Sequence, residues 1–436
     1  MKRLAPIFFC LFFSIQLIAQ ITVQTDSCRI KVSLLTCTPG TELYSTFGHS
    51  ALRIVDSSKG ANLDGTFVFD SIYNYGTFDF DDPDFYTKFV RGKLLYFLSV
   101  ESFLGPRGFR ASYEYEKRGI TEQTLYLSCE KKEKLIAALE ENAKEENKYY
   151  KYDFVRDNCT TRLWDIIEKF SDPPYTTKPL AGGETSFRKL IHEYLNKSGQ
   201  YWSKLGIDML LGAPVDRKLT TKEIQFLPDY LLKGFDSTMV AMQTPFMKLG
   251  TNLVQEKKVI LESALPPQTP AALSPLVIFS ILFLVITVLS FSRSRKIQTA
   301  LTIFDKVFFF LCGILGMLIL FMWFGTDHYT CSNNFNLLWA LPTHLFIVAI
   351  SFQKNWVKKY FRIVFWLTVA LLFCWLFLPQ QMNNALFPIA GIILVRSLFI
   401  SKRSPPDPPN RVRRRALRWR KGGLSSSTNQ HFKPLS

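Results

Sequence analysis

Five long apolar segments follow one another beyond about residue 273, and they constrain the fold of this chain more than any other feature. They cover residues 275–291, 307–324, 335–352, 361–379 and 385–400. Each segment is roughly long enough to cross a bilayer as a helix. The sequence therefore predicts an all-α region of five transmembrane spans over residues 273–403. The abundance of phenylalanine, with 39 residues, agrees with contact to lipid.

The loops between these segments alternate in charge. Residues 292–296 and 354–362 are basic, whereas residues 326–334 and 379–384 contain no Lys or Arg. Basic loops stay in the cytoplasm, so the C-terminus is predicted inside and residues 21–272 outside. Residues 1–20 resemble a secretory signal peptide, and an uncleaved anchor is the alternative. In a bacterium with two membranes, this topology places a multi-pass protein in the inner membrane with its N-terminal domain in the periplasm.

The net charge of +17 does not predict nucleic-acid binding, because much of it lies in the C-terminal tail. From residue 402 onward there are ten Lys and Arg and one acidic residue. The stretch RVRRRALRWRK (411–421) follows the last span, as expected of a topology signal that touches anionic lipid. Residues 404–436 are therefore predicted to be a basic cytoplasmic tail.

Residues 21–272 fit one domain of ordinary size with both strands and helices. Alternating apolar residues predict strands from about His49, over 66–80, 94–104 and 121–129, and residues 57–65 read as a loop. Residues 130–150 predict a helix. Five cysteines lie in outside segments: Cys28, Cys37, Cys129, Cys159 and Cys331. Because five is odd, at least one thiol stays unpaired in a monomer, and the sequence does not say which.

Cys159 lies where an amphipathic helix begins in YDFVRDNCTTRLWDII (152–167). Asp157 and Asn158 before it are good N-cap residues. The helix dipole at that end favours a thiolate and lowers the thiol pKa, which a nucleophilic cysteine requires. A buried, inert core thiol is the alternative interpretation of Cys159.

His49 is the better of two candidates for a base that would serve Cys159. It opens a predicted strand, and a sheet would hold its ring rigidly, as catalysis requires. The other histidine of this region, His192, lies in an ordinary amphipathic helix, where a surface or packing role is expected. Together, Cys159 and His49 satisfy the residue requirements of Cys–His nucleophilic catalysis. A structural histidine is the alternative for His49.

The order GHSALRI, a following strand and then NCTTRLWDII resembles the circularly permuted papain-like enzymes, including the permuted NlpC-type hydrolases and the lecithin:retinol acyltransferase group. A closer resemblance adds YNYGTFDFDDPDFYTKFVRGKLLYFLS, SFRKLIHEYL, GIDMLLGAPVDRKL and TDHYTCSNNFNLLWALPTHLF. With these stretches, most of the chain is similar to the Lnb-type lipoprotein N-acyltransferase family of Bacteroidetes. Its members pair a periplasmic domain with C-terminal membrane helices.

This resemblance implies an α+β domain of permuted papain-like fold, in which an antiparallel sheet packs on helices, and a reaction without metal or cofactor. The reaction would carry an acyl chain from a phospholipid to the α-amino group of a lipoprotein's diacylglyceryl cysteine. Cys159 would be the nucleophile and His49 the general base. Asn74 is the best candidate for the orienting third residue, with Asp70 and Asp79 as rivals.

Three further residues are candidate substrate contacts. Tyr152 precedes Cys159 at a spacing suited to an oxyanion donor, and a packing tyrosine is its alternative. His344 lies within a predicted span, where ionisable residues are functional candidates, and a neutral histidine bonded to a neighbouring carbonyl is its alternative. His328 lies in an outer loop, where anchoring at the membrane interface is its alternative. Arg396 is expected to snorkel. A membrane-tethered cysteine peptidase or amidase of the cell envelope, or a non-catalytic scaffold, are the rival functions.

Overall fold

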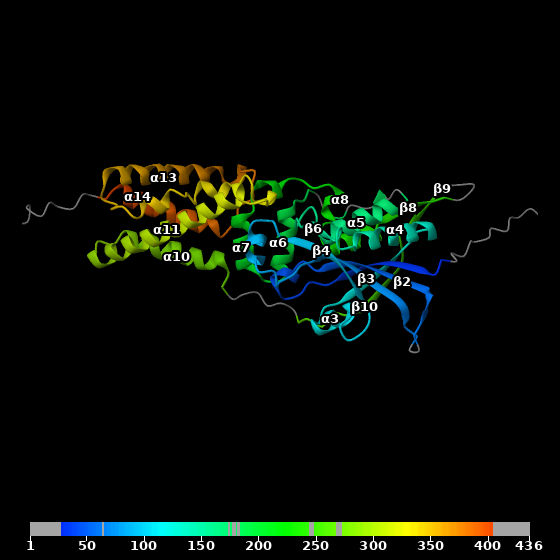
Figure 1. Ribbon diagram of the computed structural model, residues 1–436. Helices are drawn as coiled ribbons and strands as arrows, with labels where there is room; N and C mark the ends of the chain where they lie inside the picture. The colour runs from blue at the N-terminus through cyan, green and yellow to red at the C-terminus, as the bar shows by residue number, and fades with distance from the viewer. Residues whose placement is uncertain are drawn as a thin grey trace, which may run out of the picture. The chain divides into compact units, whose positions relative to one another are not determined.

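The computed structural model describes residues 28–62, 65–172, 175–176, 180, 184–243, 248–266 and 273–403 (Figure 1). The predicted signal peptide and basic tail lie outside these residues. The chain divides into two compact units, which are taken one at a time below. Unit 1 comprises Met1–Gly199 and Arg217–Thr269, and unit 2 comprises Gln200–Asp216 and Pro270–Ser436. The predicted boundary at 272 nearly coincides with this division, but residues 200–216 group with the C-terminal part.

A seven-stranded antiparallel sheet organises unit 1, with the strand order β10-β5-β1-β2-β3-β4-β6. Its strands are β1 (Ile30–Cys37), β2 (His49–Ala61), β3 (Phe67–Thr77), β4 (Leu95–Ser102), β5 (Ile120–Leu125), β6 (Tyr149–Lys151) and β10 (Val254–Leu261). A second, small sheet joins β7 (Tyr175–Thr176), β8 (Thr238–Gln243) and β9 (Lys248–Asn252).

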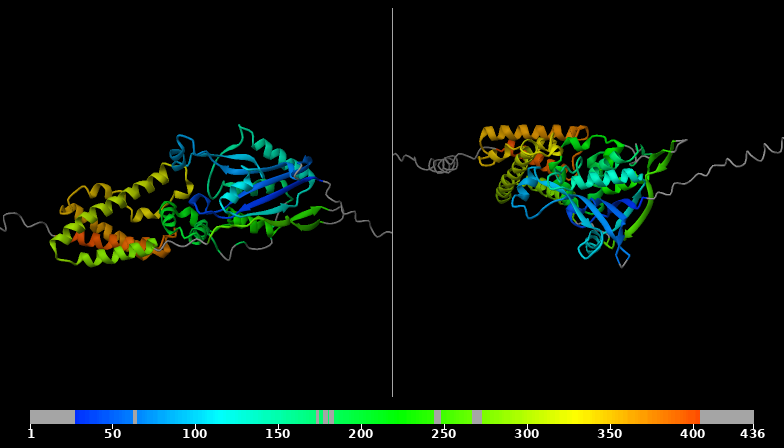
Figure 2. Two further views of the ribbon diagram at one scale, coloured as in Figure 1. Left: turned by 90° about the horizontal axis from the view of Figure 1, so that it is seen from below. Right: turned by 45° about the vertical axis from the view of Figure 1, so that its right-hand side comes forward.

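Helices cover both faces of the main sheet. The helices of unit 1 are α2 (Phe85–Val90), α3 (Phe109–Tyr115), α4 (Cys129–Asn142), α5 (Cys159–Phe170), α6 (Phe187–Lys197), α8 (Thr221–Ile224) and α9 (Pro228–Asp236), with a 3-10 turn at Leu43–Ser45. Leu34 and Leu52 pack with Leu139 of α4 and Leu163 of α5 in one apolar cluster. A second cluster joins the sheet to Phe109 of α3. Figures 1 and 2 show α3 across the sheet from α4 and α5.

The local strand and helix predictions are confirmed in type and differ in their ends. β2 begins at His49, as predicted, and runs on to Ala61, so the predicted loop over 57–65 is shorter. The hairpin with β3 is antiparallel, as predicted. The helix predicted over 130–150 ends at Asn142, because the chain then supplies the edge strand β6, which pairs with β4.

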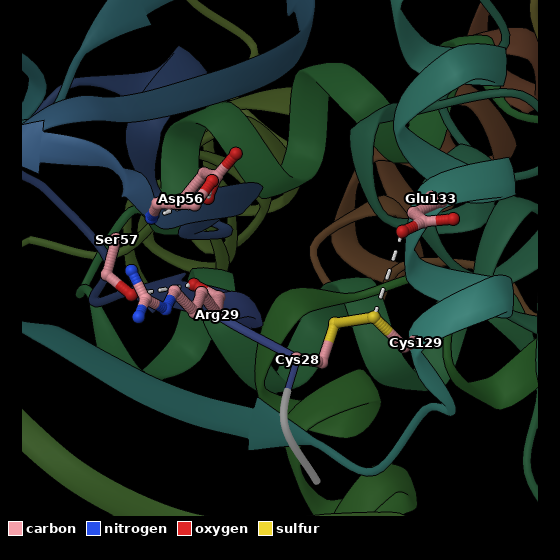
Figure 3. Close-up of a disulfide and its surroundings, with 7 residues drawn as sticks. Cys28, Arg29, Asp56, Ser57, Cys129 and Glu133 are labelled. Atoms are coloured by element: carbon pink, nitrogen blue, oxygen red, sulfur yellow. Dashed lines mark hydrogen bonds between the residues drawn. A yellow bond between two sulfur atoms is a disulfide. The ribbon is translucent and has the colours of Figure 1, made fainter.

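A disulfide joins Cys28 at the start of the described chain to Cys129, the first residue of α4 (Figure 3). It closes a loop with a sequence separation of 101 residues. Among the described cysteines, Cys37, Cys159 and Cys331 remain thiols on the segments predicted to face outward. The pairing that the sequence left open is therefore resolved.

Unit 2 is helical. It contains α7 (Tyr201–Leu210), α10 (Pro275–Ser290), α11 (Arg295–Phe324), α12 (His344–Ile347), α13 (Asn355–Cys374) and α14 (Leu386–Ser401), with 3-10 turns at Ala213–Asp216, Tyr329–Cys331, Phe335–Leu338 and Trp375–Phe377. Arg295–Phe324 and Asn355–Phe377 are long and apolar enough to cross a membrane, while Pro275–Ser290 and Leu386–Ser401 are shorter apolar helices. Large apolar side chains such as Val288 and Phe373 are mostly exposed, as in a surface that faces lipid.

Residues 335–352 do not form the single helix that a simple span requires. They hold the 3-10 turn Phe335–Leu338 and the four-residue α12, with Pro342 between them, which cannot donate a backbone hydrogen bond. This irregular chain packs directly on α11: a Cβ on Gly316 would lie 2.1 Å from Ala340 O, and one on Gly313 would lie 2.6 Å from Leu345 N. The apolar composition of residues 335–352 did not reveal that the helix is interrupted within them.

Amide side chains hold residues 200–216 in unit 2. Asn334 Nδ2 donates to Met209 O at 2.9 Å and Gln380 Nε2 donates to Leu211 O at 3.0 Å. Asn383 Nδ2 donates to Asp208 Oδ2 at 2.7 Å. These bonds satisfy the end of α7 and explain why this segment groups with the membrane helices.

Arg396 does not snorkel, so that prediction is wrong. Its side chain is fully buried, and its Nε and Nη2 donate to the two carboxylate oxygens of Asp305 at 2.7 and 2.9 Å. Its Nη1 donates to Ser290 Oγ at 2.7 Å. Asp305 supplies the counter-charge, and Asp305 and Ser290 the hydrogen bonds, that a buried guanidinium needs.

Candidate active site

A capping box begins α5 and fixes the position of Cys159. Asn158 Oδ1 accepts from the backbone N–H groups of Thr160 and Thr161 at 2.8 and 2.9 Å, and Thr161 Oγ1 accepts from Asn158 N at 2.9 Å. Asn158 Nδ2 also donates to Phe226 O at 2.9 Å, which ties the cap to the chain before α9. Cys159 is therefore the first residue of the helix, where the dipole favours a thiolate.

The structure brings the side chains of Cys159 and His49 together. His49 is the first residue of β2, opposite Cys37 of β1, and its ring is near enough to the Cys159 thiol for the two groups to shift each other's pKa. Its Nε2 lies 2.6 Å from Asn74 Oδ1. An amide oxygen only accepts, so Nε2 carries the hydrogen, and Nδ1 is left to face the thiol.

Asn74 is held in turn by the neighbouring strand. It lies in the middle of β3, and its Nδ2 donates to Glu101 Oε1 on β4 at 3.0 Å. A line of side chains therefore runs from Cys159 through His49 and Asn74 to Glu101. The rival candidates lie elsewhere: Asp70 forms a bidentate pair with Arg53, and Asp79 is exposed.

The charges of Cys159 and His49 stabilise one another. Burial alone would raise the pKa of Cys159, but the charge and hydrogen bond of His49, with a backbone hydrogen bond from Ser50, lower it to about 7. Burial would lower the pKa of His49, yet the Cys159 thiolate and Asn74 leave it raised overall. The geometry thus favours a thiolate–imidazolium pair near neutral pH.

Cys37 shows that this effect is specific to Cys159. It lies opposite His49 in the sheet and is fully buried, whereas Cys159 is only partly buried, and burial raises the pKa of the Cys37 thiol to about 12. Both thiols are cysteines of the same domain near the same histidine. Only the thiol at the helix start, with the imidazole as its partner, is set up to ionise.

Gly76 lets β3 approach the thiol closely. Its φ is +91°, a conformation that residues with a side chain rarely adopt, and a Cβ there would lie 3.4 Å from Cys159 Cβ. The β3–β4 register shifts between Asn74 and Thr77, so Gly76 lies in a bulge. Bulges often re-aim side chains beside functional sites. The sequence pattern YNYG carried this signal, although only its Asn74 was singled out.

Two tyrosines lie near the thiol and play different parts. Tyr152, the predicted oxyanion donor, stacks on Tyr96 with a centroid distance of 4.1 Å. The buried hydroxyl of Tyr150 has no hydrogen-bond partner among the described residues, and it lies 3.9 Å from the Cβ position of Gly76. Burial raises the pKa of Tyr150, so its hydroxyl stays protonated and able to donate. Sequence reasoning missed Tyr150, Glu101 and Gly76.

The two other predicted substrate contacts belong to unit 2. His344 is fully buried, and its Nδ1 lies 2.7 Å from Tyr360 Oη, which is also bonded to Thr343 Oγ1 at 2.8 Å. His328 is half-buried before the 3-10 turn at Tyr329–Cys331. Their predicted roles in substrate binding stay predictions. Within the described ranges, no three His, Cys, Asp or Glu side chains converge to hold a metal ion.

These observations describe a membrane-anchored protein whose α+β domain carries a Cys–His–Asn line. Two family models match the chain: the Lnb N-terminal periplasmic domain over residues 18–193 and the Lnb transmembrane domain over residues 267–404. The chain therefore belongs to the Lnb family, a family of membrane proteins in lipoprotein processing, and its N-terminal domain is periplasmic. No curated protein and no solved structure matches it significantly.

Proposed function

We propose that this protein transfers an acyl chain from a phospholipid, through a Cys159 thioester, to the α-amino group of a lipoprotein's diacylglyceryl cysteine. The observation that carries this proposal is the pairing of Cys159, whose thiol pKa is lowered to about 7, with His49, whose ring is held by Asn74, in a membrane protein of the Lnb family. Ester cleavage followed by amide formation is the chemistry that a thiolate and an adjacent imidazole can divide into two steps.

In the first step the Cys159 thiolate attacks the carbonyl carbon of the phospholipid ester. As the tetrahedral intermediate collapses, the C–O bond breaks and His49 gives its Nδ1 proton to the leaving glycerol oxygen. The products are a thioester on Cys159 and a lysophospholipid. Asn74 holds the ring during this transfer through the 2.6 Å contact with Nε2.

In the second step the α-amino group of the lipoprotein attacks the thioester carbonyl. His49, now neutral, takes the proton that the amine loses, and the C–S bond breaks as the amide forms. Cys159 leaves as a thiolate, and the thiolate–imidazolium pair is restored. Water must be kept from the thioester, and the Cys159 thiol is partly buried.

The negative oxygen of both intermediates needs hydrogen-bond donors. The backbone N–H of Cys159 lies at the start of α5, where helix N–H groups lack helical acceptors. We place the Tyr150 hydroxyl beside it as the second donor, in preference to Tyr152, whose ring is stacked on Tyr96. Donors aimed at a developing oxyanion in a buried site contribute strongly to the rate.

We further propose that unit 2 crosses the inner membrane five times and leaves the C-terminus in the cytoplasm. In this arrangement the irregular residues 335–352 form the third crossing. Non-helical backbone at membrane depth is tolerated where protein buries it, and the close packing on Gly313 and Gly316 meets that condition. The alternating loop charges support the orientation.

Mass spectrometry of lipoprotein N-termini tests the function. Cells without this protein should accumulate lipoproteins whose diacylglyceryl cysteine has a free amine, and the wild-type chain should restore the N-acyl group. Cys159→Ala should not restore it. Cys374→Ala, which removes an exposed thiol of unit 2, is the matched control and should restore it fully.

Two results would contradict the proposal. One is unchanged N-acylation in the deletion cells after other N-acyltransferases have been removed. The other is full restoration by Cys159→Ala at wild-type protein levels. If the variant instead changes peptidoglycan fragments while lipoproteins stay N-acylated, the envelope peptidase or amidase is the better assignment.

A further inference from the structure

An exposed apolar surface lies on unit 1 around α2. Phe80, Tyr86, Val90 and Leu95 are between 42% and 79% exposed, although α2 and its flanks belong to the periplasmic domain. Within α2 only Phe85 is buried. Several large apolar side chains exposed in one part of a domain in water are typical of a surface that something covers. We call the surface formed by these four residues the α2 face.

Aromatic rings connect the α2 face to the neighbourhood of the thiol. Tyr152, whose raised pKa reflects burial first and the charge of Cys159 second, stacks on Tyr96. Tyr96 contacts Phe78 at a centroid distance of 5.2 Å, and Phe78 contacts Phe80 and Phe85 at 4.6 and 5.8 Å. These distances are typical of packed aromatic pairs.

The series then reaches the exposed helix. Phe85 contacts Tyr86 at a centroid distance of 5.3 Å, and Tyr86 is 79% exposed. Cys159, Tyr152, Tyr96, Phe78 and Phe85 all belong to or pack on one apolar cluster. An unbroken apolar path therefore leads from the surface of the domain to the side of the thiol.

Charges of both signs border the α2 face. Asp81 and Asp84 are exposed before the helix, and Arg91 and Lys93 are exposed after it. A phospholipid with a zwitterionic headgroup presents a phosphate and an ammonium group above its acyl chains. The basic pair suits the phosphate and the acidic pair suits the ammonium, whereas a headgroup without an ammonium would leave the aspartates without a counter-charge.

We propose that the α2 face binds a zwitterionic phospholipid of the bilayer and that its acyl chain lies along the aromatic rings toward Cys159. A bilayer is within reach of this domain because the chain passes into the membrane unit at 199–200, 216–217 and 269–270. The proposal names the lipid-binding surface of the proposed acyltransferase and so rests on that function. Contact with lipid, however, can be measured without catalysis.

Photocrosslinking of the full chain in phosphatidylethanolamine nanodiscs provides the test. Tyr86→p-benzoylphenylalanine should form severalfold more phospholipid adduct, read by mass, than Tyr115→p-benzoylphenylalanine. Tyr115 ends α3 and is 90% exposed, so it is a matched exposed tyrosine outside the α2 face. Equal labelling at the two positions would overturn the proposal, as would adducts chiefly with protein, which would point to a second copy or another polypeptide.

The same measurement in Cys159→Ala separates this proposal from the proposed function. Lipid adducts at position 86 should persist without the thiol, while N-acylation is lost.

Tyr86→Ser together with Phe80→Ser should raise the KM for phospholipid severalfold and change kcat less, and Tyr115→Ser should change neither. If Cys159→Ala retained N-acylation, the proposed acyltransferase function would be wrong. The lipid adducts at position 86 would still test whether the α2 face binds phospholipid. An unchanged KM in the double variant would refute the acyl path.

Discussion

The Arg396 network of unit 2 and the Cys159 site of unit 1 use buried polar side chains in opposite ways. In unit 2 the guanidinium of Arg396 uses its three nitrogens on Asp305 and Ser290, and Ser290 Oγ donates onward to Ile286 O at 2.6 Å. That network is closed, with its hydrogen-bonding groups engaged inside the protein. A closed network of this kind fixes helices against one another and leaves nothing to bind a substrate.

The polar groups of unit 1 are arranged differently. Cys159 and His49 shift each other's pKa toward the charged forms, and the Tyr150 hydroxyl lacks a partner in the described part of the chain. A buried hydroxyl without a partner costs stability, and such costs are retained at functional sites. The contrast teaches that the number of buried polar groups is less informative than whether their bonds are complete.

The largest expected effect is on catalysis in unit 1. His49→Ala removes the base and the positive charge beside the thiol, so N-acylation should fall by about 10²–10⁴-fold. The rate should be measured with purified full-length protein and a diacylated lipopeptide. His192→Ala, in α6, is the control and should retain the wild-type rate. If His49→Ala retained activity, His49 would have a structural role and not a catalytic one.

The next effect is on the stability of unit 2. Arg396→Ala leaves the buried Asp305 with only Arg403, at 3.3 Å, as a cationic partner among the described residues, which should cost up to about 3–5 kcal/mol, whereas Arg396→Met with Asp305→Leu should cost less. Thermal unfolding in detergent measures both variants. The contrast between the units predicts that the double variant keeps its rate per folded molecule. A specific loss of rate in a stable double variant would show that the network has a further role.

Tyr150→Phe should separate stability from activity. Removing a hydroxyl that the described residues leave without a partner should raise unfolding stability by up to about 1 kcal/mol. Loss of an oxyanion donor should lower the acyl-transfer rate by about 10²-fold. Tyr152→Phe keeps the ring stacked on Tyr96 and should change the rate little. A slower Tyr152→Phe with a normal Tyr150→Phe would restore the original assignment of Tyr152.

The smallest effect concerns the pH profile of Cys159. The thiolate is the reactive form and forms as pH rises through the pKa, so alkylation should increase with a midpoint at about 7. Asn74 helps to raise the pKa of His49, so Asn74→Ala leaves His49 less charged. The thiolate then loses support, and the midpoint should move upward, less than in His49→Ala. An unchanged midpoint would remove Asn74 from the site.

Local signals in the sequence were sufficient to predict where Cys159 and His49 lie on their helix and strand. The N-cap residues before Cys159 and the strand that begins at His49 are encoded within a few neighbouring residues, and both were placed correctly. Their meeting was a hypothesis, because the contact spans 110 positions of the chain. It depends on β2 and α5 packing in one core, which no local pattern reports.

The missed features all depend on distant partners. Arg396 was assigned to the membrane surface because Asp305 lies 91 residues earlier in the chain. β10 joins the sheet beside β5 although about 130 residues separate them in sequence. The break within 335–352 escaped hydropathy, because its backbone is accommodated by Gly313 and Gly316 of another helix. The apolar composition of a segment indicates that it will be buried, but it does not identify the element against which the segment packs.

The Cys28–Cys129 disulfide has a consequence for the biogenesis of this protein. A chain exported from its N-terminus presents Cys37 to Cys28 well before Cys129 emerges, so an oxidant that acts in order of appearance would join the wrong pair. In the folded domain Cys37 is fully buried in β1, opposite His49. Burial of Cys37 in the sheet is therefore expected to favour the Cys28–Cys129 pair, while Cys159 remains a thiol beside its histidine.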